Sequence, residues 1–197
     1  MAGINTQYKK MTLEEIIILA QKDDFKALEE LIRREQRSVY ASFSYLCHNC
    51  ENVSDLTQEA LLRVAKNIQR LKNPKHFKSW LNQIITHIYY DELRKNQKKA
   101  DTISLDQEIE DIPQIKFELP DKKCKPNEKC LSLELEKIIK TAILALPDKF
   151  KIVIVLREFQ GLSYDEIASA TNSTIGTVKS RIARARSRLQ DDLRSYI

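Results

Sequence analysis

Residues 163–189 read SYDEIASATNSTIGTVKSRIARARSRL, and this stretch decides the fold. Ser163 followed by Glu166 forms a capping box, which predicts that a helix begins there. A short polar turn at 171–173 follows, and a second helix is predicted over 174–193. Two helices joined by a short turn are the arrangement found in helix-turn-helix DNA-binding proteins.

The second of these helices has one apolar face and one face of small and basic side chains. At about 100° per residue, a single apolar stripe packs on the preceding helices. The stripe consists of Val178, Ile182, Ala185 and Leu189. The opposite face consists of Ser180, Ala183, Arg184 and Ser187, with Lys179 at its edge. Small residues let a helix approach the floor of a DNA groove, while long basic side chains reach the phosphates. We therefore predict DNA binding rather than an ordinary solvated basic face.

The composition predicts a helical protein. Of 197 residues only 3 are Gly and 5 are Pro, whereas 42% are hydrophobic and 31% are charged. The length allows one large domain or two small ones. The longest apolar run, residues 16–20, is far shorter than the roughly 18–20 residues of a membrane span. The N-terminus lacks a signal-peptide pattern, so we expect a cytoplasmic protein without membrane insertion.

Capping signals also place helices in the first part of the chain. Thr12 and Glu15 form a capping box, and a second helix is expected to begin after Asp24. Asp55 followed by Gln58 has the same spacing, which predicts a further helix start at that point.

The helix expected after Asp55 has a broad apolar face and one apolar residue that points the other way. The face consists of Leu56, Ala60, Leu61, Val64, Ile68 and Leu71. Leu62 lies opposite, among the polar side chains of Gln58, Glu59, Lys66 and Gln69. An exposed leucine is either ordinary surface or part of a docking surface, and the sequence alone leaves both interpretations open.

Asn73-Pro74 separates this helix from a long one that ends in a basic run. The inward residues of the long helix are predicted to be Phe77, Trp80, Leu81, Ile84 and Ile88. Asp91 is also expected on the inward side, where a buried carboxylate needs a partner. Arg94 or Lys95 is within range by helical spacing.

An acidic linker is expected between two helical domains. Helical periodicity disappears after residue 100, and residues 101–121 contain seven acidic side chains against a single base. We predict an all-α protein with domains at 12–100 and 131–197, joined by a flexible linker at 101–130. The C-terminal domain is predicted to hold four helices.

Both domains resemble the extracytoplasmic-function (ECF) sigma factors, part of the sigma-70 family of bacterial RNA polymerase subunits. The motifs similar to sigma domain 4 are Leu146-Pro147, LRE at 156–158, GLSYDEIA at 161–168 and GTVKSRI at 176–182. The motifs similar to sigma domain 2 are DLTQEA at 55–60 and FKSWL at 77–81. The resemblance implies a subunit that gives RNA polymerase its promoter specificity, catalyses nothing itself and needs no cofactor. The chain departs from the family at Thr86 and His87, where a basic residue and Asn are usual.

The resemblance assigns three sets of contact residues. For the minus-35 promoter element, read in the major groove, they are Thr174, Thr177, Lys179, Ser180, Arg181, Ala183, Arg184 and Arg188. For the melted minus-10 element, where a flipped base is captured, they are Asn73, Lys75, His76, Trp80, Gln83, His87, Arg94 and Lys95. For the coiled coil of the polymerase clamp they are Asp55, Gln58, Glu59, Leu62, Arg63 and Lys66. The implied partners are core RNA polymerase (clamp and flap), promoter DNA and, as for many members, an anti-sigma protein.

Other interpretations carry less weight. Cys47 and Cys50 have the spacing of a zinc or redox pair, with Cys124 and Cys130 as further ligands. Cys47 and Cys50 coincide with an ordinary turn of the family, so we predict no metal site, and a thiol-based redox switch carries similarly little weight. No catalytic motif is found. One rival function is a stand-alone helix-turn-helix regulator, but the first hundred residues show no receiver or pocket pattern. The other is a helical adaptor that does not read DNA, and the acid-free basic helix argues against it.

Overall fold

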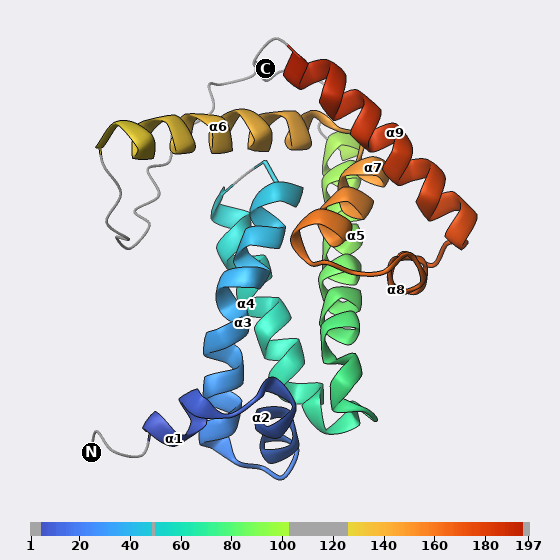
Figure 1. Cartoon of the computed structure of the whole chain (residues 1–197). Coiled ribbons are helices and arrows are strands. Elements are labelled where there is room, and N and C mark those ends of the chain that lie inside the picture. The colour runs from blue at the N-terminus through green and yellow to red at the C-terminus, as the bar shows by residue number, and fades with distance from the viewer. Residues whose placement is uncertain (1–4, 49, 103–125, 195–197) are drawn as a thin grey trace.

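The structure, a computed structural model, describes residues 5–48, 50–102 and 126–194 (Figure 1). Every regular element in these ranges is helical, which confirms the predicted fold class. We call residues 5–102 the N-terminal half and residues 126–194 the C-terminal half. Within the described ranges, no helix has both the length and the apolar content that crossing a bilayer requires.

Three long helices form the body of the N-terminal half. Its elements are α1 (Asn5–Lys10), α2 (Leu13–Ala20), α3 (Phe25–Leu46), α4 (Cys50–Asn67), the 3-10 turns η1 (Ile68–Arg70) and η2 (Pro74–His76), and α5 (Phe77–Thr102). In Figure 1, α3, α4 and α5 run alongside one another, and α2 lies beside the end of α3 at which that helix begins. All six residues of the predicted apolar face of α4 and its extension, from Leu56 to Leu71, are buried.

The predicted caps are correct at two places and wrong at a third. Thr12 caps α2 with Glu15 in a complete capping box, and Asp24 caps α3 by accepting from two backbone N–H groups. The helix start predicted at Asp55 is wrong, because α4 begins at Cys50 and Asp55 lies inside it. Val53 is buried and extends the apolar stripe by one turn, so packing continues the helix past the capping signal.

Glu30 and Arg34 hold α1 against α3. The Arg34 guanidinium donates to the carbonyl oxygens of Tyr8 (2.8 Å) and Met11 (2.9 Å). Its Nε donates to Glu30 (2.8 Å), and Arg33 makes two further hydrogen bonds to the same carboxylate. Glu30 is only 3% exposed, so the two arginines supply the partners that a buried carboxylate requires.

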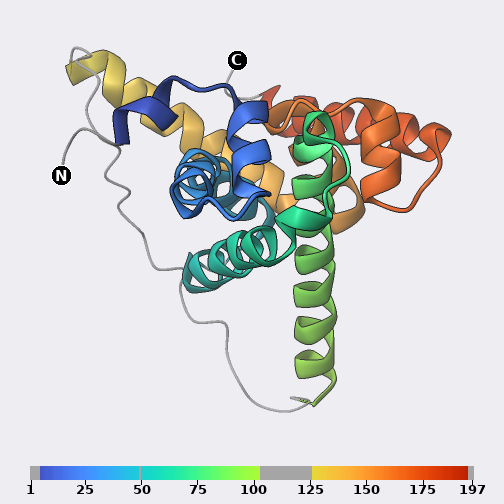
Figure 2. The ribbon, with the colours of Figure 1, turned by 90° about the horizontal axis from the view of Figure 1, so that it is seen from below.

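The C-terminal half consists of four helices, as predicted. They are α6 (Pro126–Ala145), α7 (Asp148–Ile154) continued by the π-helical turn η3 (Val155–Phe159), α8 (Tyr164–Ala170) and α9 (Ile175–Leu193). Figure 2, seen from below, shows α8 beside α5 and α9 running past α5, and α9 packs against α7. The described helices thus extend through Thr102 and resume at Pro126, and residues 103–125 of the expected linker lie outside the described residues.

The Glu30 cluster makes stability depend on pH. Hydrogen bonds from Arg33 and then Arg34 lower the pKa of Glu30 from 4.5 to about 2. A carboxyl whose pKa is lower in the folded state stabilises the fold fully above its unfolded pKa, and it loses that effect as pH falls through the folded pKa. We predict that Glu30→Gln lowers the melting temperature at pH 7, and that its difference from the unmodified protein shrinks as pH falls from about 4.5 toward 2.

Thermal unfolding followed by circular dichroism over this pH range measures the effect. Glu29→Gln is the matched control, because Glu29 is exposed on the same helix. An equal loss of melting temperature at every pH would contradict the lowered pKa of Glu30 as the cause.

Candidate nucleic-acid interface

The turn between α8 and α9 is fixed by caps at both ends. Ser163 and Glu166 form the predicted capping box at the start of α8. Asn172, in the turn, has a φ of 47°, a left-handed conformation that asparagine tolerates better than most residues. Thr174 caps α9, and its hydroxyl accepts from the Thr177 N–H (3.2 Å). The predicted helix-turn-helix is therefore present with the predicted boundaries.

The faces of α9 are arranged as the sequence predicts. Val178, Ile182 and Ala185 are buried, and Leu189 packs against the core. The assigned minus-35 residues that are exposed are Thr174, Lys179, Ser180, Ala183, Arg184 and Arg188, whereas Thr177 and Arg181 are half-buried. The helix thus offers an open surface of small and basic side chains.

Two arginines beside that surface are held by the C-terminal half itself. Arg186 makes an ion pair with Glu158 (2.6 Å). The Arg188 guanidinium lies over the Phe150 ring, 5.1 Å from its centroid, in a cation–π contact. These contacts fix the orientation of α9 on α7 and η3.

The segment between α4 and α5 forms a second polar surface. Asn73 caps η2 by accepting from the Lys75 N–H (3.0 Å), with Pro74 at the first position of the turn. A shallow groove beside η2 is lined by Thr12, Leu13, Glu14, Pro74, Lys75, Phe77 and Lys78. The assigned minus-10 residues Asn73, Lys75, His76, His87, Arg94 and Lys95 are exposed, and Trp80 and Gln83 are half-buried.

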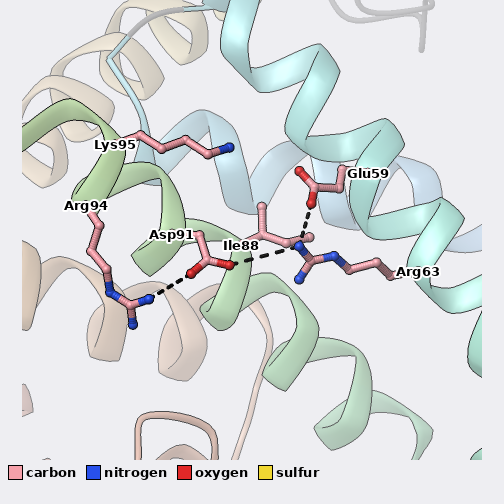
Figure 3. A pocket seen from close by; sticks show the side chains of 6 residues that line it. All are labelled: Glu59, Arg63, Ile88, Asp91, Arg94 and Lys95. Carbon is pink, nitrogen blue, oxygen red and sulfur yellow. Dashed lines mark hydrogen bonds and ion pairs between the residues drawn. The ribbon is translucent and has the colours of Figure 1, made fainter. Parts of the chain in front are cut away.

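A groove between α4 and α5 brings two of the assigned sets together (Figure 3). Arg63 of α4 pairs with Glu59 of the same helix and lies 4.0 Å from the Asp91 carboxylate on α5. Arg94 donates to the other oxygen of Asp91 (2.9 Å), and Lys95 also lines the groove. One carboxylate thereby links an assigned clamp-binding residue to an assigned minus-10 residue.

The predicted partner of Asp91 is confirmed, but its predicted burial is wrong. Arg94 is the partner, yet the Asp91 side chain is 44% exposed. Tyr89 and Ile85 occupy the fully buried positions of this helix instead, so its inward face is rotated away from Asp91.

Leu62 projects from α4 into solvent. It is 57% exposed, although its neighbours Leu61 and Val64 are buried. Asp55, Gln58 and Lys66 are exposed too, and Glu59 and Arg63 are half-buried. The six assigned clamp-binding residues therefore form a polar surface with one apolar side chain on it.

Cys47 lies where α3 ends, close to α5 and α7. Burial, followed by the nearby Glu92 carboxylate, raises the pKa of its thiol to about 12. A thiol in that state is a poor nucleophile and metal ligand. Among the described side chains, no three of His, Cys, Asp or Glu gather in a group able to hold a metal ion. The side chains of Cys50, Cys124 and Cys130 lie outside the described residues.

The sequence did not reveal the contacts that join the two halves. The Tyr89 hydroxyl donates to Asp148 (2.6 Å) across the contact between α5 and α7. Gln160 donates to the Ser42 hydroxyl (2.6 Å), and the Phe159 and Tyr45 rings lie 4.1 Å apart between centroids. These residues are far apart in the chain and belong to no motif. The one signal in the sequence was Tyr89 itself, a residue with a polar hydroxyl at a buried position of α5.

Comparison with known proteins supports the interpretation of both halves. Residues 31–99 match the family described as Sigma-70 region 2, and residues 136–189 match that described as Sigma-70, region 4. The chain is 32% identical to the ECF RNA polymerase sigma factor SigW of Bacillus subtilis, a match that covers 94% of this chain and 98% of that one. It is 30% identical to the ECF RNA polymerase sigma-E factor of Haemophilus influenzae, covering 94% and 97%.

Two further matches differ in extent. The ECF RNA polymerase sigma factor SigE of Mycolicibacterium smegmatis is 32% identical, over 85% of this chain but only 62% of that longer protein. A solved structure of the sigma factor RpoE in complex with the anti-sigma factor NepR, from Bartonella quintana, is similar in fold. Its TM-score is 0.64 at 24% identity, with 87% of this chain and 97% of that one covered.

Fold and surfaces define the class of protein: a helical transcription factor with a helix-turn-helix at its C-terminal end. The extent and identity of the matches then define the family. The chain belongs to the ECF sigma factors of the sigma-70 family, and it is an RNA polymerase sigma factor. The alternative of a stand-alone regulator is not favoured. Members of this family are in general non-catalytic regulators.

The capping box of α8 yields a test of the helix-turn-helix. Ser163→Ala removes the hydroxyl that accepts from the Glu166 N–H (3.3 Å), so we expect it to cost about 1 kcal/mol of unfolding free energy. Urea denaturation measures this loss. Ser54→Ala is the control, because Ser54 is exposed inside α4, where alanine favours the helix. Equal stability of the two variants would contradict the role of the cap.

Proposed function

We propose that this sigma factor directs core RNA polymerase to promoters by reading the minus-35 element with α9 and capturing the melted minus-10 element with η2 and α5. The observation that carries the proposal is the surface of α9. Small and basic side chains are exposed on one face, and the segment from Thr174 to Arg188 contains five bases and no acid. Such a helix is suited to enter the major groove.

At the minus-35 element, Arg184 on the exposed face of α9 and Lys179 at the edge of that face contact bases or phosphates. Thr174 and Thr177 lie at the N-terminal end of α9, where backbone N–H groups favour phosphate. Ser180 and Ala183 are small enough for close approach to the groove floor, and Arg181 and Arg188 flank it.

In the minus-10 element, the segment Asn73–His76 takes up a flipped base while Trp80, Gln83, His87, Arg94 and Lys95 follow the unpaired strand. Flipping a base costs unstacking energy, which contacts to the base and backbone offset. The groove beside η2, with Lys75 on its rim, suits such a base, and Trp80 supplies an aromatic surface for stacking.

The clamp of core polymerase binds the surface around Leu62. Asp55, Gln58, Glu59, Arg63 and Lys66 surround this leucine with the polar rim that is typical of an interface. Polymerase supplies all the chemistry, so the sigma factor is not an enzyme and acts in the cytoplasm with polymerase. We propose sigma domain 2 at 12–100, a linker at 101–130 and sigma domain 4 at 131–197. An anti-sigma protein is a further proposed partner, since the solved sigma factor RpoE of similar fold is in complex with one.

Reconstituted transcription tests the proposal. Core polymerase is incubated with and without the protein on a library of promoter fragments, and transcript starts are sequenced. Discrete starts that require the protein support it, and their upstream sequences define both promoter elements. Absence of initiation and of core binding would overturn it. Tight, specific duplex binding without polymerase would instead favour the stand-alone regulator.

Leu62→Asp tests the clamp surface. A charge at the centre of an apolar contact is desolvated without a partner, so we expect core binding to be lost while helix content is unchanged. Affinity for core polymerase is measured by fluorescence anisotropy. The matched control is Leu135→Asp, because Leu135 is 52% exposed on α6, away from the proposed surface. Normal core affinity of the Leu62 variant would count against this surface.

Arg184→Ala tests the proposed contact of α9 with the minus-35 element. We expect the binding free energy of the holoenzyme for a minus-35 duplex to fall by about 1–3 kcal/mol. A contact to phosphate would also make this affinity less dependent on salt concentration in the variant. Filter binding at several salt concentrations measures both. Arg37→Ala, which removes a charge exposed on α3, is the control for net charge. Equal losses in the two variants would exclude a specific contact at Arg184.

A further inference from the structure

The corner between α2 and α3 is held against the turn that follows α4. The side-chain amide of Gln21 donates to the carbonyl oxygens of Ile68 (3.0 Å), where η1 begins, and of Leu71 (2.6 Å), its C-cap. An amide NH2 group carries two hydrogens, so this one side chain uses both of them on the same turn. The bonded residues are 47 and 50 positions apart, so the contact fixes one element against another rather than closing a local turn.

A second contact at the same corner depends on an unusual backbone conformation. Asp23 has a φ of 64°, which glycine adopts without a steric penalty and most other residues rarely adopt. Its side chain supplies what glycine lacks, because the carboxylate accepts from the side-chain amide of Gln69, in η1, at 2.6 Å. Strained backbone of this kind persists where the surrounding contacts fix it, and it is frequent at functional sites. The residue at this position is therefore suited to holding η1 rather than to relaxing the corner.

The turn that the corner holds leads directly into the proposed base-capturing segment, Asn73–His76. Lys72 alone separates that segment from Leu71, whose carbonyl accepts from Gln21. The helix α2 contacts both η1 and η2, and Figure 1 shows it beside the turn that joins α4 to α5. The beginning of α2, residues 12–14, also lines the groove beside η2. The α2–α3 corner thus fixes the chain at the point where it enters the segment.

The segment has little burial of its own to fix its conformation. Its three polar residues are exposed, whereas Phe77, which follows it, is 1% exposed. The hydrogen bonds within the segment are local: the Lys75 and His76 N–H groups both donate to Asn73. Its place relative to the helices is therefore set at its two ends, by Phe77 and by η1.

Selection among bases requires a fixed backbone more than attraction to phosphate does. A group that recognises a base edge has to be held within about 0.5 Å of the productive geometry. Attraction between basic side chains and phosphates is independent of sequence and tolerates larger displacements. Loosening of the segment therefore lowers discrimination among bases more than it lowers the overall affinity for the strand.

We propose that Gln21 and Asp23 are positioning residues for capture of the minus-10 base. Neither contacts DNA, and together they hold η1 so that Asn73–His76 keep the conformation that distinguishes one flipped base from another. This inference rests on the proposed function, because it concerns the same segment. A purely structural role of the corner would affect stability and leave the base preference of the folded protein unchanged.

Two substitutions remove the contacts and differ in their effect on stability. Gln21→Met keeps the length of the side chain and removes both donors. Asp23→Gly removes the acceptor but relieves the left-handed backbone, so we expect a melting temperature close to that of the unmodified protein. It remains informative if the Gln21 variant folds poorly.

Two further substitutions are controls. Asp23→Asn is the conservative variant, because its amide oxygen still accepts a hydrogen bond and asparagine tolerates a positive φ. Gln36→Met is the matched control for Gln21→Met, because Gln36 is exposed on α3.

Base preference is measured on the holoenzyme. Core RNA polymerase carrying each variant is incubated with a pool of single-stranded oligonucleotides that contain a random window between fixed flanks. Sequencing of the bound strands gives the ratio of the most to the least preferred base at each position, and fluorescence anisotropy gives the affinity for the whole pool. Hydrogen exchange of the peptide covering residues 71–77, followed by mass spectrometry on the free protein, reports the order of the segment.

We expect Gln21→Met and Asp23→Gly to lower the base ratio at the most selective position by about threefold to tenfold, with little change in pool affinity. Exchange of the segment is expected to be faster in both, whereas Asp23→Asn and Gln36→Met keep the base ratio and the exchange rate of the unmodified protein. Base ratios that stay unchanged in both variants, beside a clear preference in the unmodified holoenzyme, would overturn the inference. So would a loss confined to Gln21→Met and accompanied by a lower melting temperature, since stability alone would explain it. Absence of any base preference in the unmodified holoenzyme would instead overturn the proposed capture itself.

Discussion

The hydrogen bond between the Tyr89 hydroxyl and Asp148 is the interaction on which the arrangement of the two halves depends. A tyrosine that is almost completely buried must place its hydroxyl against a partner, because an unsatisfied buried hydroxyl costs about 1–3 kcal/mol. Here that partner comes from the other half of the chain. Burial of the tyrosine, followed by its hydrogen bond to Asp148, raises the pKa of Tyr89, so the hydroxyl stays a donor throughout the physiological range. Packing of α5 is thus complete only when α7 lies against it.

Three sides of the helix α5 have different surroundings. Its apolar side, with Leu81 and Ile85, packs into the N-terminal bundle. Gln83 and Tyr89 bond to the C-terminal half, and a third side carries exposed polar and basic residues such as His87 and Arg94. A helix with so little surface of a single kind has a weak amphipathic pattern, which is why its inward face was harder to predict than that of α4.

Local signals in the sequence determined most of the fold and the outline of the candidate site. Capping boxes at Thr12 and Ser163 and the stripe of α9 depend on residues three or four apart, so they could be predicted from the sequence. The start of α4 was mispredicted because Val53 gains more from packing than Asp55 gains as a cap. The contact of Gln160 with Ser42 joins positions 118 residues apart, and no local pattern encodes it.

The polar character of the contact between the halves determines how firmly it holds. Its hydrogen bonds join Tyr89 to Asp148, Gln83 to Ser169 and Gln160 to Ser42, and each of them replaces hydrogen bonds to water. The net gain from each bond is therefore only about 0.5–1.5 kcal/mol, and the free energy of the contact is smaller than the number of its hydrogen bonds implies.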